Sequence, residues 1–294
     1  MLVKEILNSN RPSLSLEFFP PKTKAGFDKL FQVISDLMQL KPSYASVTYG
    51  AGGSTRDDTA NLVVQIQKDM GLTVVSHLTC VGSTRDELMS ILEKAAESNI
   101  ENILALRGDI PKGETVWKHI ENGFDYAVDF VSFIKKNYPH ICLGVAGFPE
   151  GHPLTPNRLK EMEYLKAKVD AGADYIVTQL FLDNRDFYDF CERCELAGIH
   201  VPVIAGVMPI TTRKGMIRMA ELAEGARFPA GLLRSVARAE NDEYFEKVGI
   251  HWAAEQMLNL VNNDVHGIHL YTLNRSRAIL QIFKSLGIKD ATQF

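Results

Sequence analysis

The sequence has few cysteines, no long apolar run and no strong excess of either charge. Four cysteines in 294 residues are too few for a disulfide framework and indicate a reducing, cytoplasmic setting. No apolar run approaches the ~18 residues of a membrane-spanning helix, and the opening segment MLVKEILNSNRPS is too short and too polar for a signal peptide. The 36 acidic and 32 basic residues give a net charge of −4. We therefore expect no binding to membranes or nucleic acid.

The usual glycine-rich nucleotide motifs are incomplete. In TYGAGGSTRDDT, Gly50, Gly52 and Gly53 follow a predicted strand, but the third glycine of G-x-G-x-x-G is replaced by Thr55. A simpler interpretation makes Ser54 or Thr55 the N-cap of the next helix. The P-loop pattern is absent from the chain. A dinucleotide-binding sheet is therefore disfavoured.

Metal-binding patterns are also missing. His77, His152 and His269 lie on different predicted units, without H-x-x-x-H or H-E-x-x-H spacing. Hydrogen bonding is the better interpretation for all three. Cys191 and Cys194 form a C-x-x-C pair on a predicted helix, but no second pair accompanies them. We expect no metal site and leave open whether this pair has any role.

The chain does contain a regular alternation of short strands and helices. Patterns such as DELMSILEKAAES and NRLKEMEYLKAKVDAGA repeat apolar residues at helical spacing between the strands. Alternating strands and helices favour a parallel sheet. Eight units predict one (β/α)8 TIM barrel domain over residues 1–294, with a doubly wound sheet as the competing architecture. The predicted strands are Leu14–Phe18, Tyr44–Thr48, Val74–Thr79, Asn102–Leu106, Cys142–Ala146, Tyr175–Gln179, Pro202–Gly206 and Gly267–Tyr271.

Two connections are longer than the others. The connection before the fifth strand contains the loop GDIPKGETVWKHIENGFD. The connection before the eighth strand contains at least two helical stretches, around Arg213–Ala223 and Asn241–Asn262. No linker rich in proline, glycine or serine divides the chain, which supports a single domain.

Polar residues of different kinds follow the predicted strands. In a barrel these positions share one rim, where active sites form. A structural role explains any one of them, but the whole set favours a site. The set comprises Glu17, Thr48, Tyr49, His77, Thr79, Arg107, Gly108, Asp109, Gly147, Phe148, Pro149, Gln179, Met208 and Arg275.

Glu17 is the most informative of these residues. It ends the strand pattern SLSLEFFPP, beside Phe18 and Phe19, and the two prolines that follow end the strand. One interpretation is an ion pair with a nearby lysine or arginine. The other is a carboxyl group desolvated by apolar neighbours, which favours the protonated form and suits a general acid.

The segment LALRGD places Arg107, Gly108 and Asp109 directly after an apolar strand. Gly108 permits a positive φ or a close approach of the backbone to a ligand. Arg107 and Asp109 either pair with each other or face a large polar cofactor, the arginine toward phosphate and the aspartate toward a ring or sugar.

Several motifs together resemble the catalytic barrel of the methylenetetrahydrofolate reductase family. They occur in order from Ser13 to Ser276: SLEFFPPKT, SVTYGAGGSTRDDT, HLTC, LALRGD, GVAGFPEGHP, KVDAGADYIVTQLFLD, AGVMPI and HLYTLNRS. The resemblance implies a (β/α)8 barrel with non-covalent FAD. It also implies transfer of reducing equivalents from NAD(P)H through the flavin to 5,10-methylenetetrahydrofolate, which gives 5-methyltetrahydrofolate in one-carbon metabolism.

The resemblance also implies residue roles. Glu17 matches the family's general acid, and Asp109 matches a carboxylate near the flavin and pterin. Gln179 and Arg275 match residues that hold the folate. The positions that match the FAD lining are Thr48, Tyr49, Ala51, His77, Arg107, Gly108, Asp109, Tyr126, Phe148, His152 and Lys168.

The chain departs from the family pattern on the helix after the seventh strand. Gly215 and Met219 occupy positions where bacterial relatives often carry a glutamine and a phenylalanine that contact substrate or nicotinamide. This leaves the electron donor open between NADH, NADPH and a partner such as ferredoxin. A folate-binding barrel or lyase without redox activity is the alternative from another class. We expect a homo-oligomer and, because the chain ends soon after the eighth strand, no regulatory domain.

Overall fold

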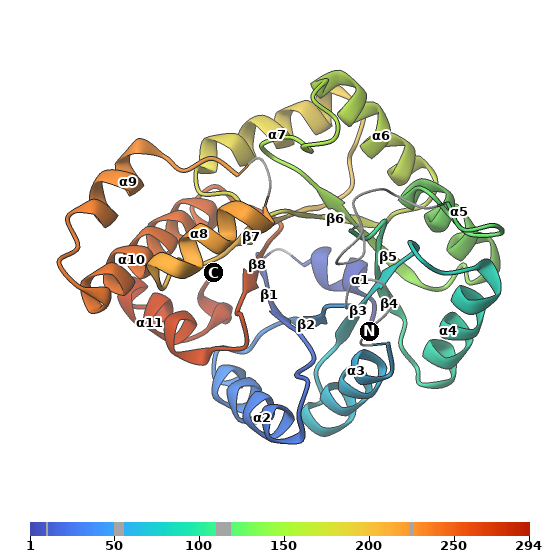
Figure 1. The fold of residues 1–294 in the computed structure, drawn as a ribbon, viewed down its shortest axis with the longest axis horizontal. Helices are drawn as coiled ribbons and strands as arrows, with labels where there is room; N and C mark the ends of the chain where they lie inside the picture. Colours follow the sequence, from blue (N-terminus) through green and yellow to red (C-terminus); the bar gives the residue numbers. More distant parts are fainter. Residues whose placement is uncertain (10, 50–55, 110–118, 224–225) are drawn as a thin grey trace.

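The computed structural model describes residues 1–9, 11–49, 56–109, 119–223 and 226–294. At its centre eight parallel strands form a closed barrel in chain order, because β8 pairs with β1 (Figure 1). This closure confirms the predicted barrel and excludes the doubly wound sheet. Each predicted strand end lies within one residue of the observed end. The strands are β1 (Ser13–Phe18), β2 (Tyr44–Val47), β3 (Val74–Thr79), β4 (Asn102–Leu106), β5 (Cys142–Gly147), β6 (Tyr175–Thr178), β7 (Val203–Val207) and β8 (Gly267–Tyr271).

Helices surround the barrel on its outer side (Figure 1). Side-chain caps begin many of them, as at α4, where Thr84 and Glu87 form a capping box. The helices are α1 (Val3–Leu7), α2 (Lys24–Met38), α3 (Arg56–Met70), α4 (Arg85–Glu97), α5 (Ala127–Asn137), α6 (Arg158–Asp170), α7 (Asn184–Leu196), α8 (Arg213–Leu222), α9 (Ala230–Ala237), α10 (Asp242–Val261) and α11 (Ser276–Leu286).

The two-residue period of β1 separates two environments. Leu14, Leu16 and Phe18 belong to the apolar layer between strands and helices. Ser15 and Glu17 point the other way, since both contact His269 on the neighbouring strand β8. The alternation seen in the sequence therefore places the carboxylate inside the barrel.

Glycine makes room for large side chains inside the barrel. A Cβ at Gly144 of β5 would lie 2.5 Å from the ring of Tyr175 on β6. A Cβ at Gly206 of β7 would lie 3.0 Å from the ring of Tyr271 on β8. Both tyrosines are thereby accommodated between neighbouring strands.

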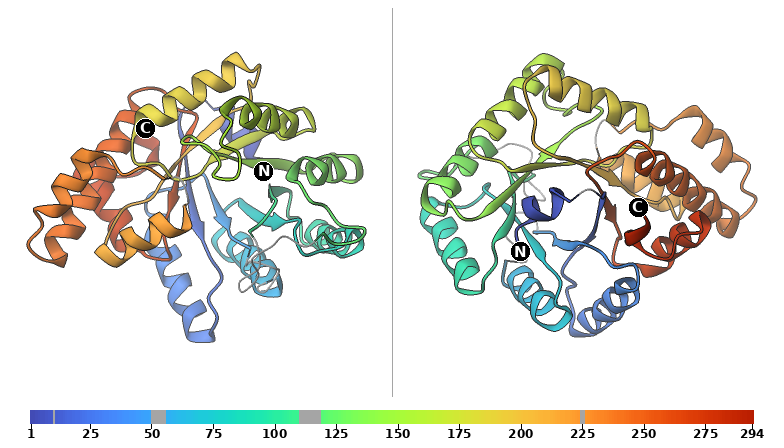
Figure 2. Two further views of the ribbon diagram at one scale, coloured as in Figure 1. Left: turned by 45° about the horizontal axis from the view of Figure 1, so that its top comes forward. Right: turned by 180° about the vertical axis from the view of Figure 1, so that it is seen from behind.

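The N-terminal helix α1 closes one end of the barrel, and Figure 2 shows it across the barrel's middle. Val3 and Leu7 pack against an apolar interior layer that includes Val75 and Ile204. The Val3 amide donates to Asn102 Oδ1 at 2.8 Å, which fixes the helix to the start of β4. The sequence pattern did not predict this helix.

In its described residues, the connection from β7 to β8 contains three helices. The two predicted stretches correspond to α8 and α10, whereas α9 was not predicted. The backbone of α9 approaches the ring of Trp252 on α10 at Gly231. The outward position of α9 is visible in Figure 1. Within the described residues, no helix has both the length and the apolar character needed to cross a bilayer.

Candidate active site

Several predicted site residues lie on the strands or directly after them. Glu17 lies on β1, His77 on β3, and Gln179 directly follows β6. Because all eight strands are parallel in a closed barrel, their carboxyl ends share one rim. The expected convergence of strand-end residues therefore follows from the observed topology.

The environment of Glu17 differs from the sequence interpretation. Phe18 packs outward against the helices and Phe19 is 42% exposed, so neither ring desolvates the carboxyl group. Its neighbours are imidazoles: Oε2 lies 3.3 Å from His269 Nε2 and 3.7 Å from His77 Nε2. Among the described residues, no lysine or arginine lies within ion-pair distance of Glu17. The alternation of the strand explains the error, because adjacent residues face opposite sides.

Ser15 and Glu17 contact the two ring nitrogens of His269. The Ser15 hydroxyl donates to the Ile268 carbonyl at 3.4 Å, and its oxygen lies 2.8 Å from His269 Nδ1. A neutral imidazole with its proton on Nδ1 presents a lone pair at Nε2. The group facing that lone pair is Glu17 Oε2. With the ring proton on Nδ1, a hydrogen bond at this contact needs a proton on the carboxyl oxygen.

His77 is a second buried imidazole beside Glu17. It is 5% exposed, and its Nε2 lies 2.6 Å from Ser46 Oγ. Burial lowers the pKa of His77 to about 4, although the nearby Glu17 opposes this shift. The ring is therefore neutral near pH 7. The predicted hydrogen-bonding role is confirmed for His77, for His269 and for His152, whose Nδ1 accepts from the Leu154 amide at 3.1 Å.

The rim after β4 brings Arg107 and Tyr126 together. The guanidinium carbon of Arg107 lies 5.6 Å from the centre of the Tyr126 ring. Arg107 forms no ion pair with Asp109, which is exposed. Gly108 has a φ of +94°, and a Cβ there would lie 2.5 Å from Val81 Cγ1. The predicted positive φ at Gly108 is confirmed.

The rim after β5 brings together three other predicted residues. The rings of Phe148 and His152 meet edge to face, with centroids 4.6 Å apart. Lys168 donates from Nζ to the Ala146 carbonyl at 2.7 Å. Burial lowers the pKa of Lys168 to about 8, while the Glu161 charge opposes the shift. Aromatic and cationic groups therefore share this part of the rim.

Glu161 is a site residue that sequence reasoning missed. It is only 6% exposed, and Oε1 accepts from the His152 amide at 3.2 Å. Oε2 has no hydrogen-bond partner in the described part of the chain. Burial raises the pKa of Glu161, and Arg158 opposes the shift. Its spacing of four and seven residues from Leu165 and Lys168 was the available signal for an inward face of α6.

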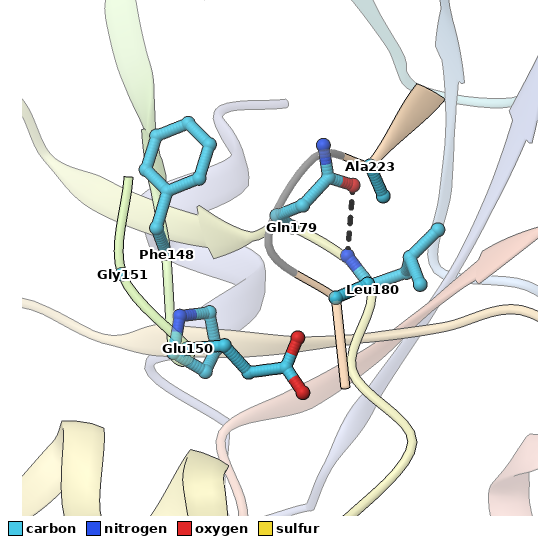
Figure 3. A pocket seen from close by; sticks show the side chains of 8 residues that line it. Phe148, Glu150, Gly151, Gln179, Leu180 and Ala223 are labelled. Carbon is cyan, nitrogen blue, oxygen red and sulfur yellow. Dashed lines mark hydrogen bonds between the residues drawn. The ribbon is translucent and has the colours of Figure 1, made fainter. Parts of the chain in front are cut away.

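Gln179 and Phe148 line one small pocket, drawn in Figure 3. The Gln179 side chain is turned back on its own loop, with Oε1 accepting from the Leu180 amide at 2.9 Å. Glu150 lines the same pocket and accepts from the Arg227 amide at 2.9 Å. Burial raises the pKa of Glu150 to about 7.

The remaining predicted residues occupy separate places. Arg275 is exposed at the N-cap of α11, and the Thr48 carbonyl accepts from Thr59 Oγ1 at 3.1 Å. Tyr49 follows Thr48, and Ala51 lies outside the described residues. The side chains of Gln179 and Arg275 make no hydrogen bond or ion pair with Glu17 in the described structure. Of the two folate candidates, Gln179 lines the pocket that also contains Phe148, whereas Arg275 is exposed.

Neither cysteine chemistry nor metal binding is supported at the C-x-x-C pair. Cys191 and Cys194 are free thiols on α7. Burial raises the pKa of both thiols to about 12, so the reactive thiolate is disfavoured. Among the described residues, no three histidine, cysteine or acidic side chains cluster as metal ligands would.

The departure on α8 has a clear structural counterpart. Gly215 is exposed in the first turn, and its amide donates to Thr212 Oγ1 at 2.9 Å. Met219 is only 5% exposed and packs in an apolar cluster with Leu180 and Leu232. Met219 therefore acts as a core residue here.

Comparison with known proteins places the chain in one family. A family model described as methylenetetrahydrofolate reductase matches residues 2–287. Methylenetetrahydrofolate reductase (NADH) 1 of Arabidopsis thaliana is 36% identical over 302 residues, which cover 99% of this chain and 51% of that protein. The 5,10-methylenetetrahydrofolate reductase of Escherichia coli is 35% identical over 278 residues, covering 94% of this chain and 91% of that protein. The chain thus spans about half the length of the plant relative.

Among solved structures, an uncharacterized Clostridium thermocellum protein that binds two copies of 5-methyl-5,6,7,8-tetrahydrofolic acid is similar throughout. It has a TM-score of 0.68 and 15% identity, with full coverage of both chains. At that identity the likeness establishes the shared fold alone. The family-model match and the sequence relatives carry the assignment further: this chain belongs to the methylenetetrahydrofolate reductase family.

Proposed function

We propose that this chain reduces 5,10-methylenetetrahydrofolate to 5-methyltetrahydrofolate, with bound FAD as the redox cofactor and Glu17 as the general acid. Family membership supports the reaction class. The observation that carries the acid role is the contact between Glu17 Oε2 and His269 Nε2 at 3.3 Å. That contact favours a carboxyl group that keeps its proton until a substrate nitrogen takes it.

The proton is needed to open the methylene bridge of the substrate. When a bridge nitrogen accepts the Glu17 proton, its bond to the methylene carbon can break, and the carbon becomes part of a cationic iminium. The Glu17 carboxylate that remains then stabilises this positive charge. Asp109, which is exposed at the rim, supplies a second negative charge for the same purpose.

The residues at the rim fit FAD by their chemistry. Arg107 and Lys168 provide cations for a diphosphate, and the ring of Tyr126 lies beside Arg107. The unpartnered Oε2 of buried Glu161 is an acceptor suited to sugar hydroxyls. Phe148 and His152 offer aromatic surface on the same side. When bound, the flavin supplies the hydride, and the protein supplies binding, orientation and the proton.

The electron donor is a separate part of the proposal. NAD(P)H is the first candidate, and the plant relative carries NADH in its name. Met219 is buried and Gly215 has no side chain. Neither position on α8 therefore offers nicotinamide the contact that the phenylalanine or glutamine of bacterial relatives would make. This observation favours slow reduction by NADH and keeps a partner protein such as ferredoxin as the second candidate.

Two half-reactions test the proposal. Purified protein loaded with FAD should be yellow, and anaerobic mixing with NADH or NADPH should bleach it. The reduced protein should then be reoxidised by 5,10-methylenetetrahydrofolate with formation of 5-methyltetrahydrofolate. A preparation that stays colourless with added FAD would instead support a folate-binding barrel without redox activity. Rapid bleaching at micromolar NADH would remove the case for a partner protein.

A further inference from the structure

Two serine–histidine pairs flank the same carboxyl oxygen of Glu17. Ser15 on β1 binds His269 on β8 at 2.8 Å, and Ser46 on β2 binds His77 on β3 at 2.6 Å. Both imidazoles direct Nε2 toward Glu17 Oε2, at 3.3 Å and 3.7 Å. Four strands thus contribute five polar side chains to one group, which centres on the Glu17 carboxyl group.

The two pairs differ in which ring nitrogen binds the serine. His269 uses Nδ1 for Ser15, which leaves Nε2 for Glu17. His77 uses Nε2 for Ser46, so the nitrogen that faces Glu17 already has a close partner. At 3.7 Å, the contact from His77 to Glu17 is longer than a hydrogen bond. Ser46 and Glu17 therefore compete for one nitrogen of His77.

We propose that His77 is a positioning residue whose Nε2–H donates to Ser46 while Glu17 is protonated and to Glu17 once Glu17 is ionised. This inference rests on the proposed general-acid role. While Glu17 is protonated, it donates to His269 and the Nε2–H of His77 donates to Ser46. When the Glu17 proton moves to the substrate nitrogen, Oε2 becomes a carboxylate oxygen facing a lone pair on His269. His77 then turns its Nε2–H from Ser46 to that oxygen.

The burial of His77 suits this role. A permanently charged imidazolium beside Glu17 would favour the carboxylate and remove the acid from the resting enzyme. The buried ring is neutral near pH 7, so it offers a hydrogen bond without a full charge. The titratable side chains that face Glu17 are His77 from β3 and His269 and Tyr271 from β8. Tyr271 stays protonated, because burial raises its pKa well above the usual value.

Two substitutions should act in opposite directions on the folate half-reaction. Ser46→Ala releases the His77 donor to Glu17 in the resting state, so activity should fall away about one pH unit lower than in the wild type. His77→Phe removes the donor, so the rate should fall about tenfold without that shift to lower pH. His77→Gln keeps an N–H donor and should recover part of the rate. Ser13→Ala, on the same strand as Glu17 and also buried, is the matched control and should change neither quantity.

The outcome that overturns the inference is equally specific. If Ser46→Ala and His77→Phe slow the folate step equally with no change in the pH profile, His77 has only a structural role. Flavin reduction by nicotinamide is measured in the same samples and should stay unchanged in Ser46→Ala and Ser13→Ala.

A second measurement does not depend on turnover. In protein with ¹⁵N-labelled histidine, long-range ¹H–¹⁵N spectra report which nitrogen of His77 carries the proton, with His77→Gln assigning the signal. We expect a neutral ring protonated at Nε2 from pH 6 to 8. Protonation at Nδ1 would overturn the inference. If the wild type fails to reduce folate but His77 shows the expected tautomer, the proposed reaction fails while the described geometry stands.

Discussion

The same strands carry different kinds of inward-facing side chain at the two ends of the barrel interior. At the end closed by α1, the inward positions are mostly apolar, as with Val75, Leu104 and Ile204, and they pack against Val3 and Leu7. At the other end, the inward positions carry carboxyl, imidazole and hydroxyl groups around Glu17. One end gains stability from apolar burial, whereas the other holds polar groups that burial disfavours.

The difference shows that the position of an inward-facing residue along its strand decides whether it packs in the apolar layer or lies in the candidate site. On β3, Val75 and His77 are two residues apart and face the same interior, one in the apolar layer and the other beside Glu17. A step of two residues along a strand covers about 7 Å. A substitution in the apolar layer should therefore alter stability, and a substitution beside Glu17 should alter the reaction.

The largest expected effect comes from Glu17→Gln. Glutamine keeps the shape and the hydrogen-bonding reach of the side chain but has no acidic proton. The folate half-reaction should slow by on the order of 10²–10⁴, which is typical for the loss of a general acid. Flavin reduction should stay within about tenfold, because it needs no proton from this residue. Stopped-flow measurement of each half-reaction decides the matter, and equal slowing of both would indicate a structural role.

The matching test at the closed end is Ile204→Ala. This side chain is fully buried in the interior apolar layer, and its truncation should lower the free energy of unfolding by about 2–5 kcal/mol. Urea denaturation measures the change. Leu196→Ala is the control, because Leu196 is 81% exposed and its loss should change stability by less than about 0.5 kcal/mol. A large loss of folate turnover per folded molecule in Ile204→Ala would contradict the separation of the two ends.

A smaller effect is expected from Asp109→Asn at the exposed rim. Removing the charge should leave FAD bound but slow the folate half-reaction on the order of tenfold, which corresponds to about 1.4 kcal/mol. The flavin potential should rise, because a nearby negative charge disfavours the anionic reduced form. Spectroelectrochemical titration and stopped flow measure the two quantities. If both stay at the wild-type values, Asp109 has no part in the site.

The sequence predicted the barrel well because its signals are local. Period-2 strands and 3.6-period helices mark each unit, and parallel pairing then follows from the crossovers. The helix α9 was missed because eight residues provide too short a pattern. For α1, five residues do not show that they close the barrel, because the contacts of Val3 with Asn102 span 99 positions.

For the candidate site, the sequence predicted polar residues at one rim of the barrel but not their contacts with one another. The pattern SLSLE already placed Ser15 and Glu17 on one face, yet the partners His77 and His269 lie on strands distant in sequence. For the same reason, adjacent Phe18 was mistaken for a neighbour of the carboxyl group. Glu161 shows a second limit, since burial of one glutamate on a charged helix depends on packing that a single sequence does not reveal.

The smallest expected effect concerns Glu150 at the pocket shared by Gln179 and Phe148. Burial is the main cause that raises the pKa of this carboxyl group to about 7 from a usual value of 4.5. The nearby Asp186 adds to the rise, whereas the Arg227 amide opposes it. Between about pH 4.5 and pH 7 the folded protein therefore binds more protons here than the unfolded chain.

The contribution of Glu150 to stability should follow from that difference. It is fully present below about pH 4.5 and is lost as the pH rises through about 7, because the unfolded chain then gives up its proton more easily than the folded protein. Glu150→Gln cannot ionise but keeps an acceptor for the Arg227 amide, so its advantage in melting temperature over the wild type should grow from pH 5 to pH 8. Glu163→Gln on the exposed side of α6 is the control and should show no such trend. A constant difference between wild type and Glu150→Gln across this range would mean that the carboxyl group is ionised throughout. The Arg227 hydrogen bond would then outweigh burial at this end of the barrel.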